Sequence, residues 1–182
     1  VACIQTSSGE DPKKNILKLE KLFEKAFKKK PDLVCLPECV SLLTDSKKIL
    51  GNYSVKKSNE FVEFIKKKAQ ANSCYILIGS LAYKNNNNKF SNRSILISPE
   101  GKSLIYYDKI NLFDVTLSEK EIYMESNLYD SGKKICVYNL PWGKIGLTIC
   151  YDLRFPNMYR KMSKKGAIFF SMKKIRFKKN EK

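Results

Sequence analysis

Apolar residues recur at two different spacings along the first half of the chain. Short apolar runs, which are typical of buried strands, occupy Val1–Gln5, Leu33–Leu36 and Cys74–Leu81. Between them, apolar residues return every three or four positions over residues 12–30 and 59–71, with lysines and glutamates on the other face, which predicts two amphipathic helices. Strands that alternate with helices in this order are typical of a layered α/β domain.

Two pairs of apolar runs in the second half, each separated by a turn sequence containing Pro and Gly, predict antiparallel hairpins. The paired runs are Arg93–Ser98 with Leu104–Tyr107, and Ile135–Leu140 with Lys144–Cys150. A helix over 156–164 and a strand over 167–171 should follow. The polar stretch 108–134 predicts irregular structure, and no linker between domains is visible.

The length and composition favour a single globular domain. A chain of 182 residues with 43% hydrophobic residues can bury an ordinary core. No apolar stretch reaches the roughly 18 residues that a membrane helix needs, and the N-terminus lacks a signal-peptide layout. We therefore expect a cytoplasmic protein with no membrane association, although a chain that begins at Val1 leaves targeting by a preceding segment open.

The net charge of +17 raises nucleic-acid binding as an alternative, since clustered cations release counterions from phosphates. Nearly all of this charge is lysine, however, and the lysines form short runs on predicted helix surfaces without interleaved aromatic residues for base stacking. We expect solvated helix faces and no nucleic-acid partner. The alternative has no motif behind it and predicts a steep fall in affinity with salt.

The chain contains no histidine, which excludes Ser-His-Asp and Cys-His catalysis and most catalytic zinc sites. Six cysteines lie mostly in apolar segments, without the secretory context of a disulfide framework, so we expect reduced thiols. Cys35 and Cys39 have no second cysteine pair to complete a zinc site. We therefore predict no metal, and a hydrolase of this sequence would need a carboxylate or lysine as its base.

Three ionisable residues follow strand-like runs: Glu38, Lys109 and Cys150. Ligands of open α/β sheets gather outside the carboxyl ends of strands, so all three can converge on one crevice, where Lys109 and nearby amide dipoles would favour the Cys150 thiolate. Each of the three residues also has a purely structural interpretation. Cys150 can be a buried core residue, Glu38 a helix-start carboxylate and Lys109 a surface lysine.

Four segments decide between these readings, because they occur in the order and spacing of a known family. LVCLPE at 33–38, YYDKINLFDV at 106–115, YMESN at 123–127 and GKIGLTICYDLRFP at 143–156 resemble the nitrilase superfamily of carbon-nitrogen hydrolases. The resemblance is closest to the Nit branch, which contains the ω-amidases and deaminated-glutathione amidases. It runs from Val1 to about Ala167 and implies a four-layer α-β-β-α sandwich.

The resemblance implies a role for each catalytic position. Cys150 matches the nucleophile, Glu38 the general base, Lys109 the lysine that stabilises the oxyanion, and Glu125 a second glutamate that supports the lysine and the substrate amide. It implies hydrolysis of a small carboxylic or 2-oxo acid amide through a cysteine thioester, with ammonia released. It also implies no cofactor and a homodimer or higher homo-oligomer.

Two departures from the family pattern stand out. Asn111 occupies the place of a histidine in the lysine motif, and after Ser171 the sequence diverges into the lysine-rich stretch MKKIRFKKNEK. We therefore expect residues 1–171 to be the N-terminal two thirds of a single domain that is incomplete at its C-terminus, with 172–182 a divergent basic tail. A truncated gene model, an intron read as coding, or a decaying gene would explain the tail.

Two questions stay open at this point. The chain can be an amidase, or a catalytically inactive, truncated nitrilase-like subunit with a binding or assembly role. Tyr151 and Arg154 are candidate substrate-binding residues, Tyr151 through its backbone N–H and Arg154 through a substrate carboxylate. Asp152 and Arg154 can equally pair with each other and brace the turn.

Overall fold

The computed structural model describes residues 1–53, 55–85, 89–119 and 121–171. Its larger sheet has five strands in the order β1-β2-β3-β4-β5. The strands are β1 (Ala2–Cys3), β2 (Leu33–Cys35), β3 (Tyr75–Lys84), β4 (Phe90–Ile97) and β5 (Ser103–Asp108). The first three are parallel, and β4 and β5 continue the sheet as the predicted antiparallel hairpin.

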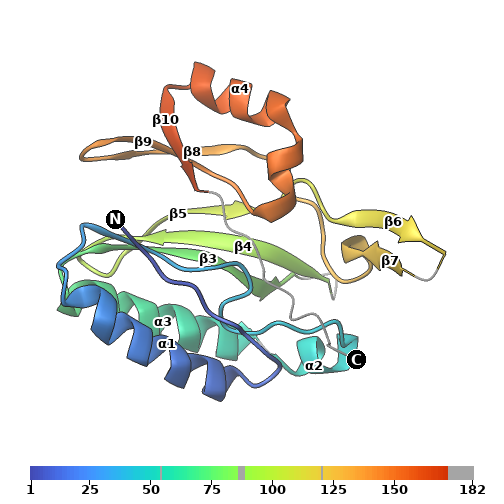
Figure 1. Cartoon of the computed structure of the whole chain (residues 1–182), viewed down its shortest axis with the longest axis horizontal. Helices are drawn as coiled ribbons and strands as arrows, with labels where there is room; N and C mark the ends of the chain where they lie inside the picture. The colour runs from blue at the N-terminus through green and yellow to red at the C-terminus, as the bar shows by residue number, and fades with distance from the viewer. Residues whose placement is uncertain (54, 86–88, 120, 172–182) are drawn as a thin grey trace.

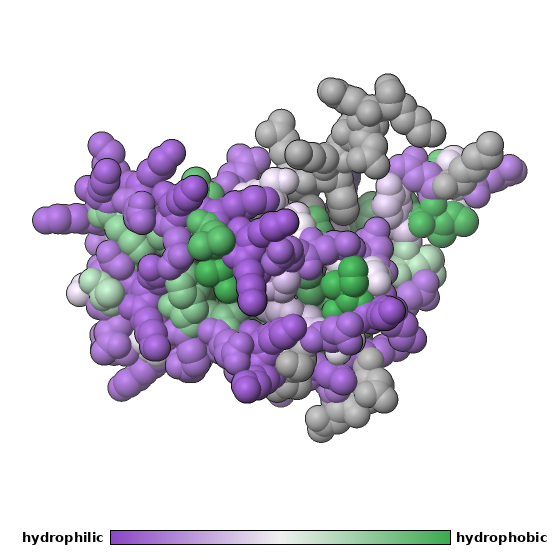
Figure 2. Space-filling model, turned by 90° about the horizontal axis from the view of Figure 1, so that it is seen from below, coloured by the Kyte–Doolittle hydropathy of each residue, from purple (hydrophilic) through white to green (hydrophobic). Residues whose placement is uncertain are grey.

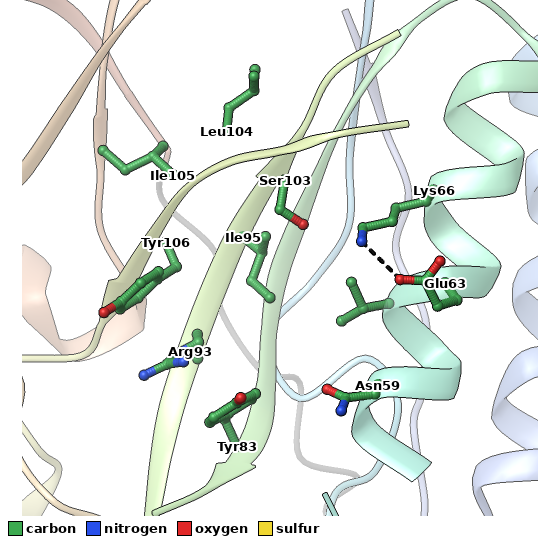
Figure 3. Close-up of a pocket in the computed structure, with 11 residues that line it drawn as sticks. Asn59, Glu63, Lys66, Tyr83, Arg93, Ile95, Ser103, Leu104, Ile105 and Tyr106 are labelled. Carbon is green, nitrogen blue, oxygen red and sulfur yellow. Dashed lines mark hydrogen bonds and ion pairs between the residues drawn. The ribbon is translucent and has the colours of Figure 1, made fainter. Parts of the chain in front are cut away.

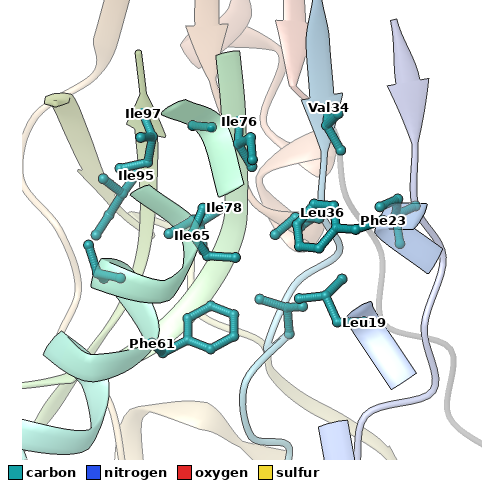
Figure 4. Packing of buried hydrophobic residues seen from close by; sticks show 14 of the residues in the cluster. Leu19, Phe23, Val34, Leu36, Phe61, Ile65, Ile76, Ile78, Ile95 and Ile97 are labelled. Carbon is teal, nitrogen blue, oxygen red and sulfur yellow. The ribbon is translucent and has the colours of Figure 1, made fainter. Parts of the chain in front are cut away.

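Helices α1 (Pro12–Phe27) and α3 (Val55–Ala71) cover one face of this sheet (Figure 1). The Asp11 carboxylate caps α1 by accepting from the backbone N–H groups of Lys13 and Lys14, and Pro12 fits the first turn because it lacks the N–H that would be unsatisfied there. Apolar side chains from both helices and from the strands form one buried cluster (Figure 4). Its largest members include Leu19, Phe23, Leu36, Phe61, Ile65, Ile76 and Ile78.

A smaller sheet lies over the opposite face of the first. It consists of β8 (Cys136–Leu140), β9 (Gly143–Leu147) and β10 (Ala167–Ser171), and helix α4 (Pro156–Lys164) packs on its outer side (Figure 1). A second apolar cluster joins the two sheets through Leu77, Leu96 and Tyr107 on one side and Ile145 and Leu147 on the other. The layers therefore run helix, sheet, sheet, helix, as expected.

The structure corrects the sequence reading in two places. The polar stretch predicted to be irregular contains a hairpin, β6 (Asp114–Ser118) with β7 (Glu121–Met124), followed by a 3-10 turn, η1 (Glu125–Asn127). A short helix, α2 (Lys47–Asn52), was also missed. The hairpin strands are mostly exposed on both faces, so they lack the apolar alternation that identifies a strand.

The helical face of the molecule is largely hydrophilic, as Figure 2 shows for the side that carries α1 and α3. Lys21 and Lys25 of α1 and Lys57 and Lys67 of α3 are exposed there. Among the described residues, no helix combines the length and the apolar character needed to cross a membrane. The predicted tail, 172–182, lies outside the described residues, so the division at residue 171 stays a prediction.

Candidate active site

Glu38 lies just beyond the carboxyl end of β2, where the chain leaves the sheet. Leu36 continues the strand pairing by donating its N–H to the Leu77 carbonyl at 2.9 Å. Gly79 of β3 lets this segment approach closely, because a Cβ there would overlap the carbonyl oxygens of Leu36 and Pro37. Cys39, the residue after Glu38, has a left-handed backbone (φ 49°) and donates its N–H to the Ser80 hydroxyl. This turn buries Glu38, which is only 4% exposed.

Lys109 directly follows β5 and is also buried. Its backbone N–H donates to the Asn92 carbonyl, and its carbonyl accepts from the Gly132 N–H. The ammonium Nζ lies 3.3 Å from Glu38 Oε1 and 2.8 Å from Glu125 Oε2. The structural readings of Glu38 as a helix-start carboxylate and of Lys109 as a surface lysine are therefore wrong.

Glu125 reaches the same point from η1, at the end of the β6–β7 hairpin. Its Oε2 accepts the Phe113 backbone N–H at 2.7 Å as well as the Lys109 ammonium. The hairpin that the sequence did not reveal thus delivers the second carboxylate. Its side chain remains 14% exposed, whereas those of Glu38 and Lys109 are each 2% exposed.

Asn92 of β4 completes the group and was missed from the sequence. Its Nδ2 donates to Glu38 Oε1 and to Glu125 Oε1, both at 3.0 Å. We call Glu38, Asn92, Lys109 and Glu125 the carboxylate–lysine cluster. The strand was expected from Arg93, whereas β4 begins at Phe90, so Asn92 fell outside the predicted strand.

Burial and the charge of the opposite partner shift the pKa values of Glu38 and Lys109 in opposite directions. Desolvation raises the pKa of Glu38 above its usual range, and the charge of Glu125 adds to this, while Lys109 and the Asn92 hydrogen bond offset only part of it. Burial alone would lower the pKa of Lys109, but the charges of Glu38 and Glu125, with that of Cys150, raise it overall. Lys109 is therefore held as an ammonium ion beside a carboxyl that gives up its proton reluctantly.

Cys150 enters from the second sheet, three residues beyond β9, at the first position of a 3-10 turn, η2 (Cys150–Arg154). It has a left-handed backbone (φ 45°), which L-residues adopt at a cost of roughly 1–2 kcal/mol, and it is partly rather than fully buried. A thiolate at Cys150 would add to the charges that raise the pKa of Lys109. Cys150 also packs against the second apolar cluster, so its role as nucleophile stays a prediction beside the core interpretation.

Asp152 anchors the turn that carries Cys150 and is completely buried. Its carboxylate accepts hydrogen bonds from the Tyr107 hydroxyl at 2.7 Å, from the Ile149 N–H at 2.9 Å, and from both the backbone and the side chain of Asn111. Tyr107 and Asn111 flank Lys109, so this carboxylate ties the cysteine turn to the lysine segment. Asn111, which departs from the family pattern, keeps a hydrogen bond at that position.

The expected pairing between Asp152 and Arg154 is wrong. The Asp152 carboxylate is buried, and its oxygens accept from Tyr107, Asn111 and Ile149. Arg154, in contrast, is exposed at the end of the 3-10 turn. Tyr151 is half-buried, with its ring 5.0 Å from that of Phe113 and 5.6 Å from that of Phe155. Whether Tyr151 and Arg154 bind substrate stays a prediction.

A surface pocket of about 380 Å³ lies elsewhere, between α3 and the outer face of β4 and β5 (Figure 3). Within it, the Arg93 guanidinium lies 4.0 Å from the ring centres of both Tyr83 and Tyr106. Arg93 is bound through two nitrogens to the two oxygens of Asp108, at 2.7 and 2.9 Å. None of the predicted catalytic residues lines this pocket.

The described residues contain no group of three or more Cys, Asp and Glu side chains placed to hold a metal ion. All six cysteines lie in the described part of the chain and are reduced there. The carboxylate–lysine cluster holds its own cation, Lys109, between its two carboxylates. That catalysis needs no metal or cofactor stays a prediction.

Comparison with known proteins defines the class to which this fold and site belong. Residues 1–180 match the model of the carbon-nitrogen hydrolase family. The chain therefore belongs to the carbon-nitrogen hydrolases, with the α/β fold of the nitrilases.

Among curated proteins, it is 30% identical over 174 residues to a deaminated glutathione amidase of Dictyostelium discoideum, covering 90% of this chain and 59% of that protein. It is 31% identical over 153 residues to omega-amidase NIT2-B of Xenopus laevis, covering 84% of this chain and 55% of the relative. The chain thus spans less than two thirds of the length of these relatives.

Solved structures support the fold. The NitFhit protein of Caenorhabditis elegans superposes with a TM-score of 0.86 at 28% identity, covering 93% of this chain and 42% of that one. An amidase from Nesterenkonia sp. gives a TM-score of 0.79 at 20% identity, covering 93% of this chain and 62% of the other. The expected nitrilase-like α/β architecture is confirmed.

Proposed function

We propose that the chain hydrolyses the amide of a small carboxylic or 2-oxo acid through a thioester on Cys150, releasing ammonia. The observation that carries this proposal is the buried contact of Lys109 with two carboxylates, in which Glu38 Oε2 has no hydrogen-bond partner among the described residues. A buried carboxylate oxygen without a hydrogen-bond partner costs folding free energy, which suggests that a proton donor binds there during the reaction. The similarity to proteins named amidases supports the same reaction class.

In the first half of the proposed reaction, Glu38 takes the proton of the Cys150 thiol, and Sγ attacks the amide carbon. The carbonyl oxygen becomes an oxyanion, which the Lys109 ammonium and the backbone N–H of Tyr151 stabilise. The C–N bond then breaks, and the leaving nitrogen takes the proton from Glu38 and departs as ammonia. The acyl group remains on Cys150 as a thioester.

In the second half, Glu38 takes a proton from water, and the resulting hydroxide attacks the thioester carbon. The C–S bond breaks, the carboxylic acid leaves, and the proton on Glu38 returns to the thiolate. One carboxyl therefore acts as base and acid twice in each cycle. Its raised pKa suits this exchange, because a carboxylate of ordinary pKa would return a proton poorly near neutral pH.

Glu125 has a supporting role in this scheme. Its Oε2 binds the Lys109 ammonium, and the Phe113 N–H fixes that oxygen in place. This carboxylate helps to raise the pKa of Lys109, so that the lysine stays charged and ready for an oxyanion. Exposed Arg154 is a candidate for the distal carboxylate of the substrate, and a homo-oligomeric, cytoplasmic enzyme remains the expectation.

The direct test is ammonia release by the purified chain from a panel of ω-amides of dicarboxylic and 2-oxo acids. Cys150→Ala should abolish release, whereas Cys3→Ala, which removes an exposed thiol from β1, should not change it. Intact-mass measurement of Glu38→Gln with the best amide should reveal whether an acyl group is retained on the protein. Folded protein that releases no ammonia from any amide would favour the inactive binding or assembly subunit instead.

A further inference from the structure

Asn92 occupies an unusual position, because a single amide nitrogen lies between two carboxylates. Its Nδ2 donates to one oxygen of Glu38 and one oxygen of Glu125, each at 3.0 Å. The same two carboxylates also share the Lys109 ammonium. The four side chains therefore form a closed ring, in which the asparagine is the only uncharged member.

The orientation of this amide follows from chemistry. A carboxylate oxygen accepts hydrogen bonds, and an asparagine side chain offers two N–H donors on nitrogen and none on oxygen. With carboxylates on both sides, only the nitrogen can face them, and its two hydrogens supply one to each. Asn92 is 2% exposed, so water does not readily replace it in this place.

The ring leaves one oxygen of Glu38 open. Oε1 receives both Lys109 and Asn92, while Oε2 is buried without a partner among the described residues. A carboxylate held by one donor alone could rotate and present either oxygen, or bring Oε2 onto the lysine. Two donors on the same oxygen fix the carboxylate plane and leave Oε2 for the chemistry.

We propose that Asn92 is a positioning residue that fixes Glu38 with Oε2 as the proton-accepting oxygen and keeps Glu125 on Lys109. The inference rests on the proposed amide hydrolysis, to which it adds a residue that touches neither the attacked carbon nor the nucleophile. Asn92 acts through the two carboxylates, and loss of its donor should impair proton transfer more than substrate binding.

The surrounding charges set the direction of the expected pH effect. Glu38 is influenced by the charges of Lys109 and Glu125, and the Cys39 thiol and the Tyr129 hydroxyl lie within reach of its charge. Of these, Lys109 lowers the pKa of the Glu38 carboxyl, Glu125 raises it, and the Asn92 hydrogen bond lowers it. Removal of the asparagine donor should therefore move the acid limb of activity to higher pH.

The test uses Asn92→Leu, which has a similar volume and no donor. We expect kcat to fall about 100-fold with KM changed less than about threefold, because misplacement of a reacting group affects the chemical step. The acid limb of kcat/KM should move to higher pH. Asn92→Ser, which can donate one hydrogen bond, should recover part of kcat and part of the shift.

Ser94→Ala is the matched control for stability. Ser94 is buried two positions along the same strand, and its hydroxyl donates to the Ile78 carbonyl at 2.7 Å. This variant also loses one buried hydrogen bond, but no charged group loses a partner. It should melt at a lower temperature with an unchanged acid limb; an equal shift in both variants would overturn the proposal.

A second readout separates this inference from the proposed reaction. Alkylation of Cys150 by iodoacetamide, followed by mass spectrometry of the peptide that carries it, reports thiol deprotonation without any amide substrate. A wild-type chain that releases no ammonia but whose alkylation profile shifts in Asn92→Leu would refute the amidase proposal and retain the positioning role. An active wild type with unmoved pH profiles in Asn92→Leu would refute the positioning role alone.

Discussion

The two faces of the β4–β5 strand pair carry different arrangements of charged side chains. On the face toward the second sheet, Asn92 and Lys109 belong to a cluster with two carboxylates and one ammonium. On the opposite face, toward α3, the neighbouring residues Arg93 and Asp108 form a one-to-one pair with two hydrogen bonds. We call Arg93, Asp108 and the flanking Tyr83 and Tyr106 rings the outer clasp.

The two sites differ in whether every buried carboxylate oxygen has a hydrogen-bond donor. In the outer clasp, each Asp108 oxygen has an arginine donor, and the guanidinium lies 4.0 Å from the centre of each tyrosine ring. In the carboxylate–lysine cluster, a buried Glu38 oxygen has no partner among the described residues. A fully matched pair contributes to stability, whereas a buried oxygen without a partner lowers stability.

Loss of the lysine should break the cluster most completely. Lys109→Met would leave two carboxylates close together without their shared cation. Breaking a buried pair in this way typically costs about 3–5 kcal/mol of unfolding free energy. Urea unfolding should show this loss, and any ammonia release should disappear. Lys102→Met, an exposed lysine of the turn before β5, should change neither measurement.

Gly79→Ala tests the cluster without touching a charge. A Cβ at this position would overlap the Leu36 and Pro37 carbonyl oxygens, so the segment that carries Glu38 must move. We expect a loss of about 1–3 kcal/mol in unfolding free energy, together with reduced catalysis. Gly51→Ala, where a Cβ meets no atom within 4 Å, should be neutral or stabilising. Equal stability of the two variants would contradict the close-approach argument.

Breaking the outer clasp should affect stability but leave the pH dependence of catalysis unchanged. The Arg93 and Asp108 side chains are 15% and 20% exposed, so Arg93→Met should cost about 1–2 kcal/mol, less than the loss of Lys109. A double-mutant cycle with Asp108→Asn isolates the pair energy. The exposed Glu63–Lys66 pair, at 2.7 Å, provides the comparison and should give about 0.5 kcal/mol or less. A clasp energy no greater than this would show that its partial burial adds nothing.

The effect of Glu38 on stability should appear only as a change in the slope of stability against pH. Because the pKa of Glu38 is raised from 4.5, the folded state holds this proton more tightly than the unfolded chain. Stability should therefore fall as pH rises from about 4.5 toward the folded-state value, by about 1.4 kcal/mol for each unit of pKa difference. Glu38→Gln should remove that fall in urea unfolding series. An unchanged slope would mean that the carboxyl titrates normally.

Much of this site was predictable because its residues follow apolar strands. The runs before Glu38, Lys109 and Cys150 identify strand ends, and the Pro156–Lys164 helix and the Ala167–Ser171 strand have the bounds that the pattern predicts. Local spacing does not say which strand ends face each other, so the sequence could not pair Asn92 with two carboxylates.

The missed β6–β7 hairpin and the wrong Asp152–Arg154 pair have the same physical origin. Glu125 was recognised from a motif, but the exposed hairpin that carries it has no apolar period. Asp152 and Arg154 are close in sequence, which suggested a pair, yet the partners of Asp152 include Tyr107 and Asn111, some 40 residues earlier in the chain. Polar contacts between distant segments are set by tertiary packing, which sequence periodicity does not encode.

The division of the site between two sheets also has a consequence for the order in which it is made. Glu38, Asn92, Lys109 and Glu125 all precede Cys150 in the chain, and synthesis proceeds from the N-terminus. The strands and turns that carry the carboxylates and the lysine therefore leave the ribosome before the thiol does. The carboxylate–lysine cluster can therefore form before Cys150 is added to the chain.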